Sequence, residues 1–327
     1  MSQFFSIILN AEFGYSVLRV TTPILFATLG ALISDKAGVI NIALEGIMLI
    51  SALAGVIFSA MTGSAWFGLL MAVIVGGLVG LSLGYFSLNL KTDVILAAVA
   101  LNLIASGGTI FVLYLVAGDK GISSSLASQV IPKLQIPLLK SIPVLGPIFS
   151  GHNALTYIAF LMVFLVWFFL YKTPLGLRIR AVGENEHAAD SVGISVVKVR
   201  YIALVLSGVL AGFGGAYMSM GYVSWFSRDM TAGRGFIALA AEAMGGASPV
   251  GGMFTSLLFG FFDALSNSLQ ILKIPYEFVS MLPYVAVVIG LVIYTVRKTE
   301  QVKRIQERAV AAADVAGTGA PAAGEEA

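Results

Sequence analysis

The sequence predicts an all-α fold, a polytopic transmembrane helical bundle, on three observations. Of the 327 residues, 58% are hydrophobic and only 11% are charged, and the mean hydropathy of +0.94 is far too apolar for a water-soluble domain of this size. Apolar runs of about 20 residues, the length that crosses roughly 30 Å of hydrocarbon as a helix, recur from residue 17 to residue 296. Long segments of alternating polarity are absent, which favours helices over barrel strands.

The apolar runs divide the chain into three regions. Residues 1–16 are too short in apolar content to span and are expected to lie at the membrane interface. Residues 17–296 form the transmembrane domain, with about eight to ten spans. Residues 297–327 are expected to form a disordered tail, because from about residue 309 they are rich in Ala, Gly and acidic residues without periodicity. The expected spans are 17–33, 39–61, 64–87, 93–117, 154–171, 201–222, 235–247, 251–270 and 279–296.

Basic residues predict the orientation of these spans. Five of the 19 lie in the loop 172–200, and five more lie in 297–308. The positive-inside rule therefore places both segments in the cytoplasm. Counting spans outward from the loop puts the N-terminus outside and the C-terminus inside.

Two segments depart from a simple helix. Residues 118–152 contain four of the ten prolines, which favours an extended external structure over a long helix. Residues 235–247 are too short to cross the membrane and run into GGASPVGG. A broken or half-penetrating helix fits them better, and it requires protein or water to satisfy its free backbone groups.

A short repeat predicts two inverted halves. The stretch GVINIALEGI, from Gly38, aligns without a gap to GFIALAAEAM, from Gly235, and Gly, Ile, Ala and Glu coincide. The matched acids are Glu45 and Glu242. On the predicted topology the two copies cross the membrane in opposite directions, an arrangement typical of transporters.

Polar residues inside the apolar runs are expected to face the bundle interior, because a carboxylate at mid-membrane costs roughly 2.5–3.5 kcal/mol. Asn41 and Glu45 are expected to share a helix face, as are Asp263 and Asn267, at spacings of four. Two interpretations are open for Glu45 and Glu242. They accept hydrogen bonds from neighbouring helix N-termini and pin the halves together, or they line a solute path. We favour the first, because a path that must release its cargo gains little from a fixed charge. The pathway or repeat-interface candidates are Asn41, Glu45, Asn102, Glu242, Asp263 and Asn267.

Glycines at spacings of four predict close helix contacts. Gly76, Gly80 and Gly84 form two overlapping G-x-x-x-G units, and Gly208 and Gly212 repeat the spacing. Such small residues allow helix backbones to approach in membranes.

The loop 171–201 is the most polar internal segment. Pro174 and Gly176 end the preceding span, and Asn185 can cap a short helix over about 186–192 that Gly193 stops. Connectors between spans need no internal helix. We therefore expect this one to dock into a groove of another protein.

Together, DKAGVINIALEGIMLISA, GENEHAADSVGI and SGVLAGFGGA resemble the permease subunits of ATP-binding cassette (ABC) importers of the ribose and branched-chain amino acid type, and most closely the nucleoside, or simple sugar, permeases. The resemblance implies a multi-pass protein of the bacterial plasma membrane with two inverted repeats and a cytoplasmic coupling helix. It implies a second, related permease, a cytoplasmic ATPase that binds ATP and Mg²⁺, and an external solute-binding protein. The implied cargo is a nucleoside or related solute, moved by ATP-driven alternating access. The implied ATPase contacts are Arg178, Arg180, Gly183, Glu184, Asn185, Glu186, Ala188, Ala189, Gly193 and Ile194.

Several kinds of site are not expected. The chain has no G-x-x-x-x-G-K-[ST] motif, so we expect no ATP site, no bound cofactor and no enzymatic activity of its own. Its two histidines, His152 and His187, lie in separate loops, and no metal site is expected. There is no cysteine, and a net charge of +2 does not indicate a nucleic-acid partner. The alternative function is a secondary, proton-coupled transporter that uses Glu45 or Glu242.

Overall fold

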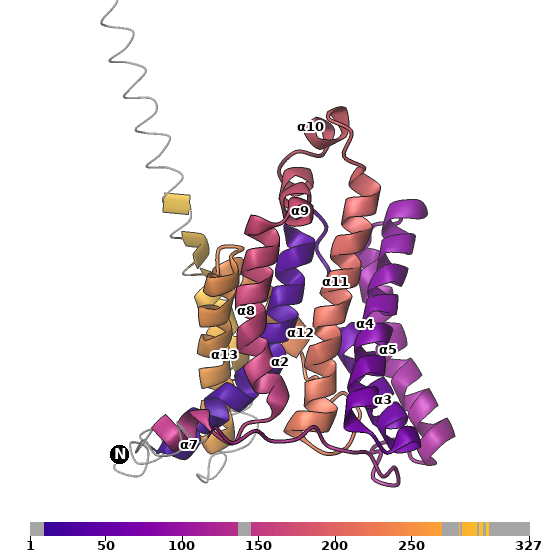
Figure 1. The fold of residues 1–327 in the computed structure, drawn as a ribbon, viewed down its shortest axis with the longest axis vertical. Coiled ribbons are helices and arrows are strands. Elements are labelled where there is room, and N and C mark those ends of the chain that lie inside the picture. The colour runs from indigo at the N-terminus through magenta and orange to yellow at the C-terminus, as the bar shows by residue number, and fades with distance from the viewer. Residues whose placement is uncertain are drawn as a thin grey trace, which may run out of the picture.

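The computed structural model describes residues 10–136, 145–269 and 281–300, apart from 282, 293, 297 and 298, and it confirms an all-α bundle (Figure 1). Within these residues there is no strand, only isolated bridges between Ile122 and Ser227 and between Lys133 and Asn153. The elements are α2 (Ala11–Asp35), α3 (Leu44–Thr62), α4 (Ala65–Gly84), the π-helical turn η1 (Tyr85–Asn89), α5 (Val94–Ala117), α7 (Leu145–Phe149), α8 (Ala154–Lys172), α9 (Pro174–Glu184), α10 (Glu186–Ser191), α11 (Val196–Tyr217), the π-helical turn η2 (Met218–Tyr222), α12 (Arg234–Met244) and α13 (Pro249–Leu269).

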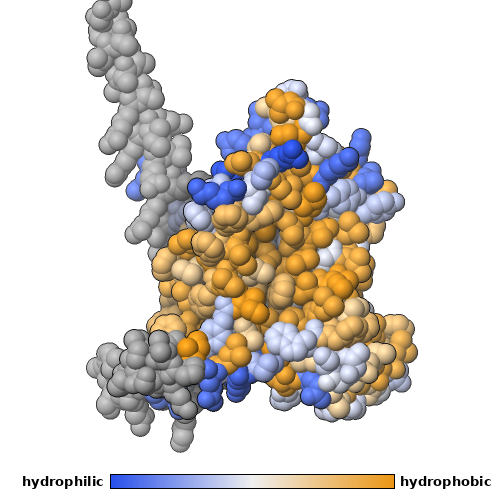
Figure 2. All heavy atoms as spheres, viewed as in Figure 1, coloured by the Kyte–Doolittle hydropathy of each residue, from blue (hydrophilic) through white to orange (hydrophobic). Residues whose placement is uncertain are grey.

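Seven helices are long and apolar enough to cross a membrane: α2, α3, α4 with η1, α5, α8, α11 with η2, and α13. A shorter apolar helix follows over Pro283–Val296. Figure 2 shows the result as a hydrophobic band between two hydrophilic ends, one of which carries α9 and α10. The chain is therefore a multi-pass membrane protein.

The first span begins earlier than expected. Asn10 caps α2 by accepting a hydrogen bond from the Glu12 N–H, so residues 11–16 belong to this helix. Residues 1–9 of the expected interfacial segment lie outside the described residues, as do nearly all of the expected tail, 297–327.

The second span begins later than expected, and this corrects one prediction. The helix expected over 39–61 starts at Leu44, and Asn41 lies in a non-helical connection in which Gly38 has a φ of 73°. The Asn41 side chain accepts a hydrogen bond from the Ala43 N–H, a local bond that competes with helix formation. Asn41 and Glu45 therefore do not share a helix face.

Close glycine contacts hold the centre of the bundle, as predicted. A Cβ added at Gly76 of α4 would lie 2.5 Å from the Gly208 carbonyl oxygen of α11, and Gly80 packs as tightly against Leu204. The neighbouring α2 is fully buried from Val20 to Ser34. The small residues therefore bring α4 against α11, and α11 encloses α2 together with α13, α12 and α8.

The half-penetrating helix predicted over 235–247 is confirmed as α12. Its 11 residues extend only about 16 Å, half the hydrocarbon thickness. Thr28 of α2 donates to the Ala238 carbonyl of α12 (3.4 Å) and accepts from Ser256 of α13 (3.0 Å). Protein therefore encloses the short helix on the sides that face α2 and α13.

The four-residue match between Gly38–Glu45 and Gly235–Glu242 does not join equivalent local structures. Gly38 lies in a turn, whereas Gly235 lies in the first turn of α12. Glu45 lies in the first turn of α3, whereas Glu242 lies near the end of α12. The match therefore carries no argument for the repeat.

Candidate functional site

The loop between α8 and α11 forms two capped helices. Thr173 accepts a hydrogen bond from the Gly176 N–H (3.1 Å) at the start of α9, where Pro174 occupies the first position. Asn185, with a φ of −155°, ends α9 and caps α10 by accepting from the Ala188 N–H (2.9 Å). Gly193, at a φ of 81°, turns the chain toward α11. The short helix predicted over 186–192 and both of its boundaries are confirmed.

The ends of α9 and α10 are fixed to the bundle. Gly183 packs directly on the Lys36 carbonyl at the end of α2. Arg200 of α11 pairs with Glu186 of α10 (2.6 Å) and donates to the Ala37 carbonyl (3.3 Å). Direct contacts therefore join α9 and α10 to α11 and to the end of α2.

The predicted ATPase-coupling residues divide into two groups. Arg178, Gly183, Glu184, Asn185, Ala188 and Gly193 are exposed. Ala189 is only 4% exposed and packs in the chain's own core, which corrects the expectation that it contacts a partner. Arg180 also faces inward, because it donates to the Leu170 carbonyl (3.0 Å) and lies over the Tyr171 ring, and Ile194 is partly buried against the core.

A groove of about 370 Å³ lies beside the tip of α10. Arg178 and Lys198 line it together with Val192, whose side chain is 74% exposed. An exposed valine among cations on a polar end of the molecule is suited to contact another protein.

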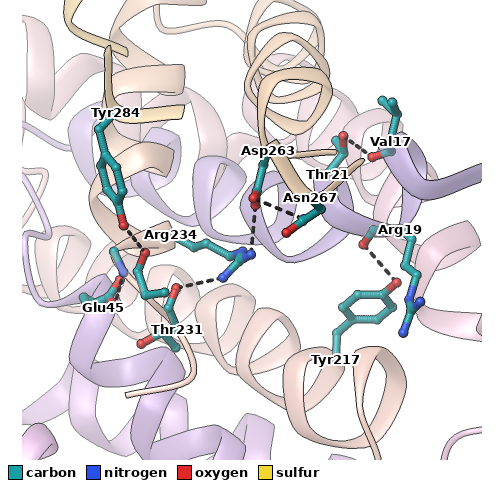
Figure 3. A network of polar contacts seen from close by, with 12 residues as sticks. Val17, Arg19, Thr21, Glu45, Tyr217, Thr231, Arg234, Asp263, Asn267 and Tyr284 are labelled. Carbon is teal, nitrogen blue, oxygen red and sulfur yellow. Dashed lines mark hydrogen bonds and ion pairs between the residues drawn. The ribbon is translucent and has the colours of Figure 1, made fainter. Parts of the chain in front are cut away.

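Glu45 joins two helix N-termini (Figure 3). Its Oε1 accepts a hydrogen bond from the Gly233 N–H (2.8 Å), and its Oε2 accepts one from the Gly235 N–H (2.7 Å). No side chain of α12 caps that helix, so the carboxylate of α3 supplies the cap. Because Glu45 also lies in the first turn of α3, its charge is stabilised by two helix dipoles.

A second polar cluster holds the other side of α12 (Figure 3). Arg234, at the first position of α12, pairs with Asp263 of α13 at 2.8 Å, and both side chains are largely buried. Asn267 donates to Asp263 (3.5 Å), so the predicted shared face of these two residues is confirmed. Tyr284 donates to the Ala232 carbonyl (2.8 Å) just before the helix.

The three remaining pathway candidates, Asn102, Asn41 and Glu242, make no hydrogen bond to the Glu45 carboxylate among the described residues. Asn102 of α5 accepts from the Gly46 N–H (2.8 Å) and donates to the Ile42 carbonyl (3.0 Å), which ties α5 to the start of α3. Asn41 donates to Ser207 of α11 (2.9 Å). Glu242 is 8% exposed, and its Oε1 has no hydrogen-bond partner within the described parts of the chain.

Comparison with known proteins identifies the chain. The sequence profile of the family described as branched-chain amino acid transport system / permease component matches residues 15–296. The chain belongs to this permease family. It is 36% identical to the nucleoside ABC transporter permease protein NupC of Lactococcus lactis subsp. cremoris, over 85% of this chain and 90% of the relative.

Two further relatives resemble the permease over most of their length. The guanosine ABC transporter permease protein NupQ of Bacillus subtilis is 37% identical over 88% of this chain and 92% of its own. The putative glucose ABC transporter permease protein TsgC13 of Haloferax volcanii is 33% identical over 80% and 79%. No solved structure matches significantly. The family makes this chain a transport component rather than an enzyme.

The structure of the permease adds polar residues that the sequence analysis missed. Arg234 directly precedes the GFIALAAE stretch, and a cation beside an apolar run could have been predicted to pair with a buried carboxylate. Ser207, which binds Asn41, and Ser106, which binds Asp229 (3.1 Å), gave none, because serine is common in membrane helices. Asp229 itself lies in a polar segment that reads as an ordinary loop.

Proposed function

We propose that this chain is the permease subunit of an ABC importer that moves nucleosides. The observation that carries the proposal is its 36–37% identity, over at least 85% of the chain, to two permeases whose names specify nucleosides and guanosine. A neutral solute suits an interior in which Glu45 and Asp263 are engaged by Gly233, Gly235 and Arg234.

The α10 end is proposed to face the cytoplasm. It carries the larger share of the basic side chains that the structure describes, as the positive-inside rule requires of that side. The C-terminus is proposed to be cytoplasmic as well, because five basic residues lie in 297–308. The basic residues at this end are Lys36, Lys91, Lys172, Arg178, Arg180, Lys198 and Arg200.

The α9–α10 loop is proposed as the contact with the ATPase. Arg178, Glu184 and Ala188 offer exposed side chains, and Arg200 connects α10 to α2 and α11. ATP and Mg²⁺ would be bound by the ATPase and not by this chain. ATP binding can move the bundle only if the docked ATPase stabilises one conformation of the bundle more than the other. A loop that is fixed to the bundle at several points would pass this difference on to the helices.

The other partners follow from the orientation. A second, related permease completes the translocation path, as the two guanosine permease proteins named in Bacillus subtilis, NupQ and NupP, indicate for that organism. An external solute-binding protein would deliver cargo to the surfaces formed by 118–152 and 223–234. One relative is named for glucose and not for a nucleoside, so the identity of the solute is the first property to test.

The proton-coupled alternative is not supported. The relatives named above are ABC transporter permeases, and both oxygens of Glu45 are occupied by backbone N–H groups. Protonation of Glu45 would remove the charge that holds these two N–H groups and would weaken the cap of α12.

Reconstitution tests the proposal. The chain is purified with its second permease and ATPase, placed in vesicles and supplied with the binding protein, and uptake of guanosine is measured with and without ATP. We expect uptake that requires ATP and survives an uncoupler. Uptake that persists without ATP and collapses with the uncoupler would overturn the importer assignment, and ATP-driven uptake of glucose without guanosine would overturn the nucleoside.

A further inference from the structure

A polar contact lies deep within the span of α5. Ser106 is 12 residues after Val94 and 11 before Ala117, which places it about 18 Å and 16 Å from the two ends of the helix. Its hydroxyl donates a hydrogen bond to Asp229 Oδ1 (3.1 Å). Because the hydrocarbon layer is about 30 Å thick, this carboxylate lies at membrane depth.

The charges at this depth are not buried by the chain. The Asp229 side chain is 52% exposed, and that of the adjacent Arg228, 3.3 Å away, is 64% exposed. This differs from Arg234 and Asp263, whose paired side chains are 13% and 14% exposed. Exposed charges at this depth are very costly against lipid, so this face of the bundle borders water.

The segment that carries Asp229 is held in place along its length. The Arg228 N–H donates to the Gly121 carbonyl (2.8 Å), Tyr284 binds Ala232, and Glu45 binds Gly233. Asp229 itself has a φ of 50°, a conformation that Asp and Asn tolerate better than most residues. The carboxylate is therefore positioned before any ligand arrives.

The described part of the chain leaves the surface of α5 next to Ser106 uncovered. A Cβ added at Gly107 would have no atom within 4 Å, and Gly108 is nearly as open. The polar groups that meet α5 one residue earlier, at Ser106, are the carboxylate of Asp229 and the guanidinium of Arg228 that pairs with it. They offer acceptors and donors but, as an ion pair, little net charge.

We propose that Asp229, with Arg228 and Ser106, forms a binding site for the solute within the translocation path. The proposal rests on the proposed function, since it takes the ligand to be a neutral nucleoside. Asp229 Oδ2, which Arg228 contacts at 3.3 Å, has a further lone pair that would accept hydrogen bonds from the 2′ and 3′ sugar hydroxyls, and Arg228 would donate to an acceptor of the base. Because the oxygen that binds Ser106 remains engaged, the site holds the solute by few bonds and can release it.

Accessibility of cysteine tests whether the face borders water. The chain contains no cysteine, so Ser106→Cys and Gly107→Cys introduce single reactive thiols. In vesicles that hold the full transporter, we expect a membrane-impermeant cationic methanethiosulfonate to modify both, and guanosine to slow the reaction. The control is Phe164→Cys, which is mid-span in α8 and 58% exposed and should remain unmodified in lipid. Failure to modify either of the first two thiols would overturn the proposal.

Substitution of Asp229 tests its role in binding. Asp229→Gly removes the carboxylate while glycine accepts the positive φ, and Asp229→Asn keeps one oxygen. We expect the glycine variant to raise the KM for guanosine by about tenfold or more, as loss of a charged hydrogen bond does. The asparagine variant should show a smaller rise. For 2′,3′-dideoxyguanosine, which lacks the 2′ and 3′ hydroxyls, neither variant should change the KM.

Controls separate this proposal from the proposed function. Asp93→Asn makes the same change at the exposed N-cap of α5, where asparagine caps as well as aspartate, and should leave the KM unchanged. If the wild-type transporter takes up guanosine with ATP but both Asp229 variants keep its KM, the site is wrong and the function stands. If the wild type takes up no nucleoside, the proposed function fails before the variants are compared. An equal rise for guanosine and the dideoxy compound would show that Asp229 only supports the fold.

Discussion

Replacement of Glu45 by glutamine should lower the stability of the bundle and leave transport specificity intact. The carboxylate accepts from the Gly233 and Gly235 N–H groups at 2.8 and 2.7 Å, and the amide offers one oxygen in place of two. One N–H group of α12 therefore loses its acceptor and faces an NH₂ group. The loss of a charged hydrogen bond costs about 1.5–3 kcal/mol, and the loss of a charge at helix N-termini about 0.3–1 kcal/mol more.

These contributions give a destabilisation of about 2–4 kcal/mol, which lowers the apparent Tm by about 4–8 °C at about 2 °C per kcal/mol for a chain of this size. The assay is thermal unfolding of the purified complex in detergent, with guanosine uptake measured in parallel. Glu12→Gln, on the exposed first turn of α2, is the matched control and should shift the Tm by less than about 2 °C. An unchanged Tm for Glu45→Gln would refute the capping role, and an unchanged Tm with an altered KM would place Glu45 in the path.

Three further predictions concern other parts of the molecule. Ala188→Arg should reduce ATP-driven uptake by about tenfold or more while ATP hydrolysis and insertion persist, whereas Ala189→Arg should instead destabilise the loop, because Ala189 is buried; equal effects on uptake and on Tm from both would contradict the docking surface. Gly76→Leu should lower stability by about 1–3 kcal/mol or prevent assembly, since its Cβ meets the backbone of α11, and an unchanged Tm would refute that packing. Burial lowers the pKa of His152 below its usual 6.5, so the unfolded chain takes up this proton first and the Tm should fall as the pH drops below 6.5. His152→Gln should flatten that decline and His187→Gln should not, and the reverse pattern would contradict the assignment.

Local signals in the sequence were sufficient where the structure is decided locally. Asn185 and Gly193 bound α10 because a cap and a left-handed turn depend on adjacent residues. The shortness of α12 followed from the length of its apolar run. The glycine spacing in α4 and α11 predicted close packing because only small side chains let helix backbones meet.

Contacts between distant residues could not be read from these patterns. Hydropathy indicates that Glu45 is enclosed, but its partner Gly233 is 188 residues away in the sequence. The sequence around either residue does not indicate that the two are in contact. The same holds for Ser106 and Asp229, which are 123 residues apart. The start of α3 was misplaced for a different reason, because apolar periodicity continues through residues 39–43 while Asn41 binds the backbone there.

The central claim is that the α9–α10 loop of this permease docks on an ATPase. Because the chain is free of cysteine, Ala188→Cys carries a single photoactivatable cross-linker on the exposed face of α10. In the active, assembled transporter, the claim predicts a cross-link to the ATPase subunit that changes in yield when ATP is added. A transporter that takes up solute while the cross-linker at this position captures only lipid or water would contradict it.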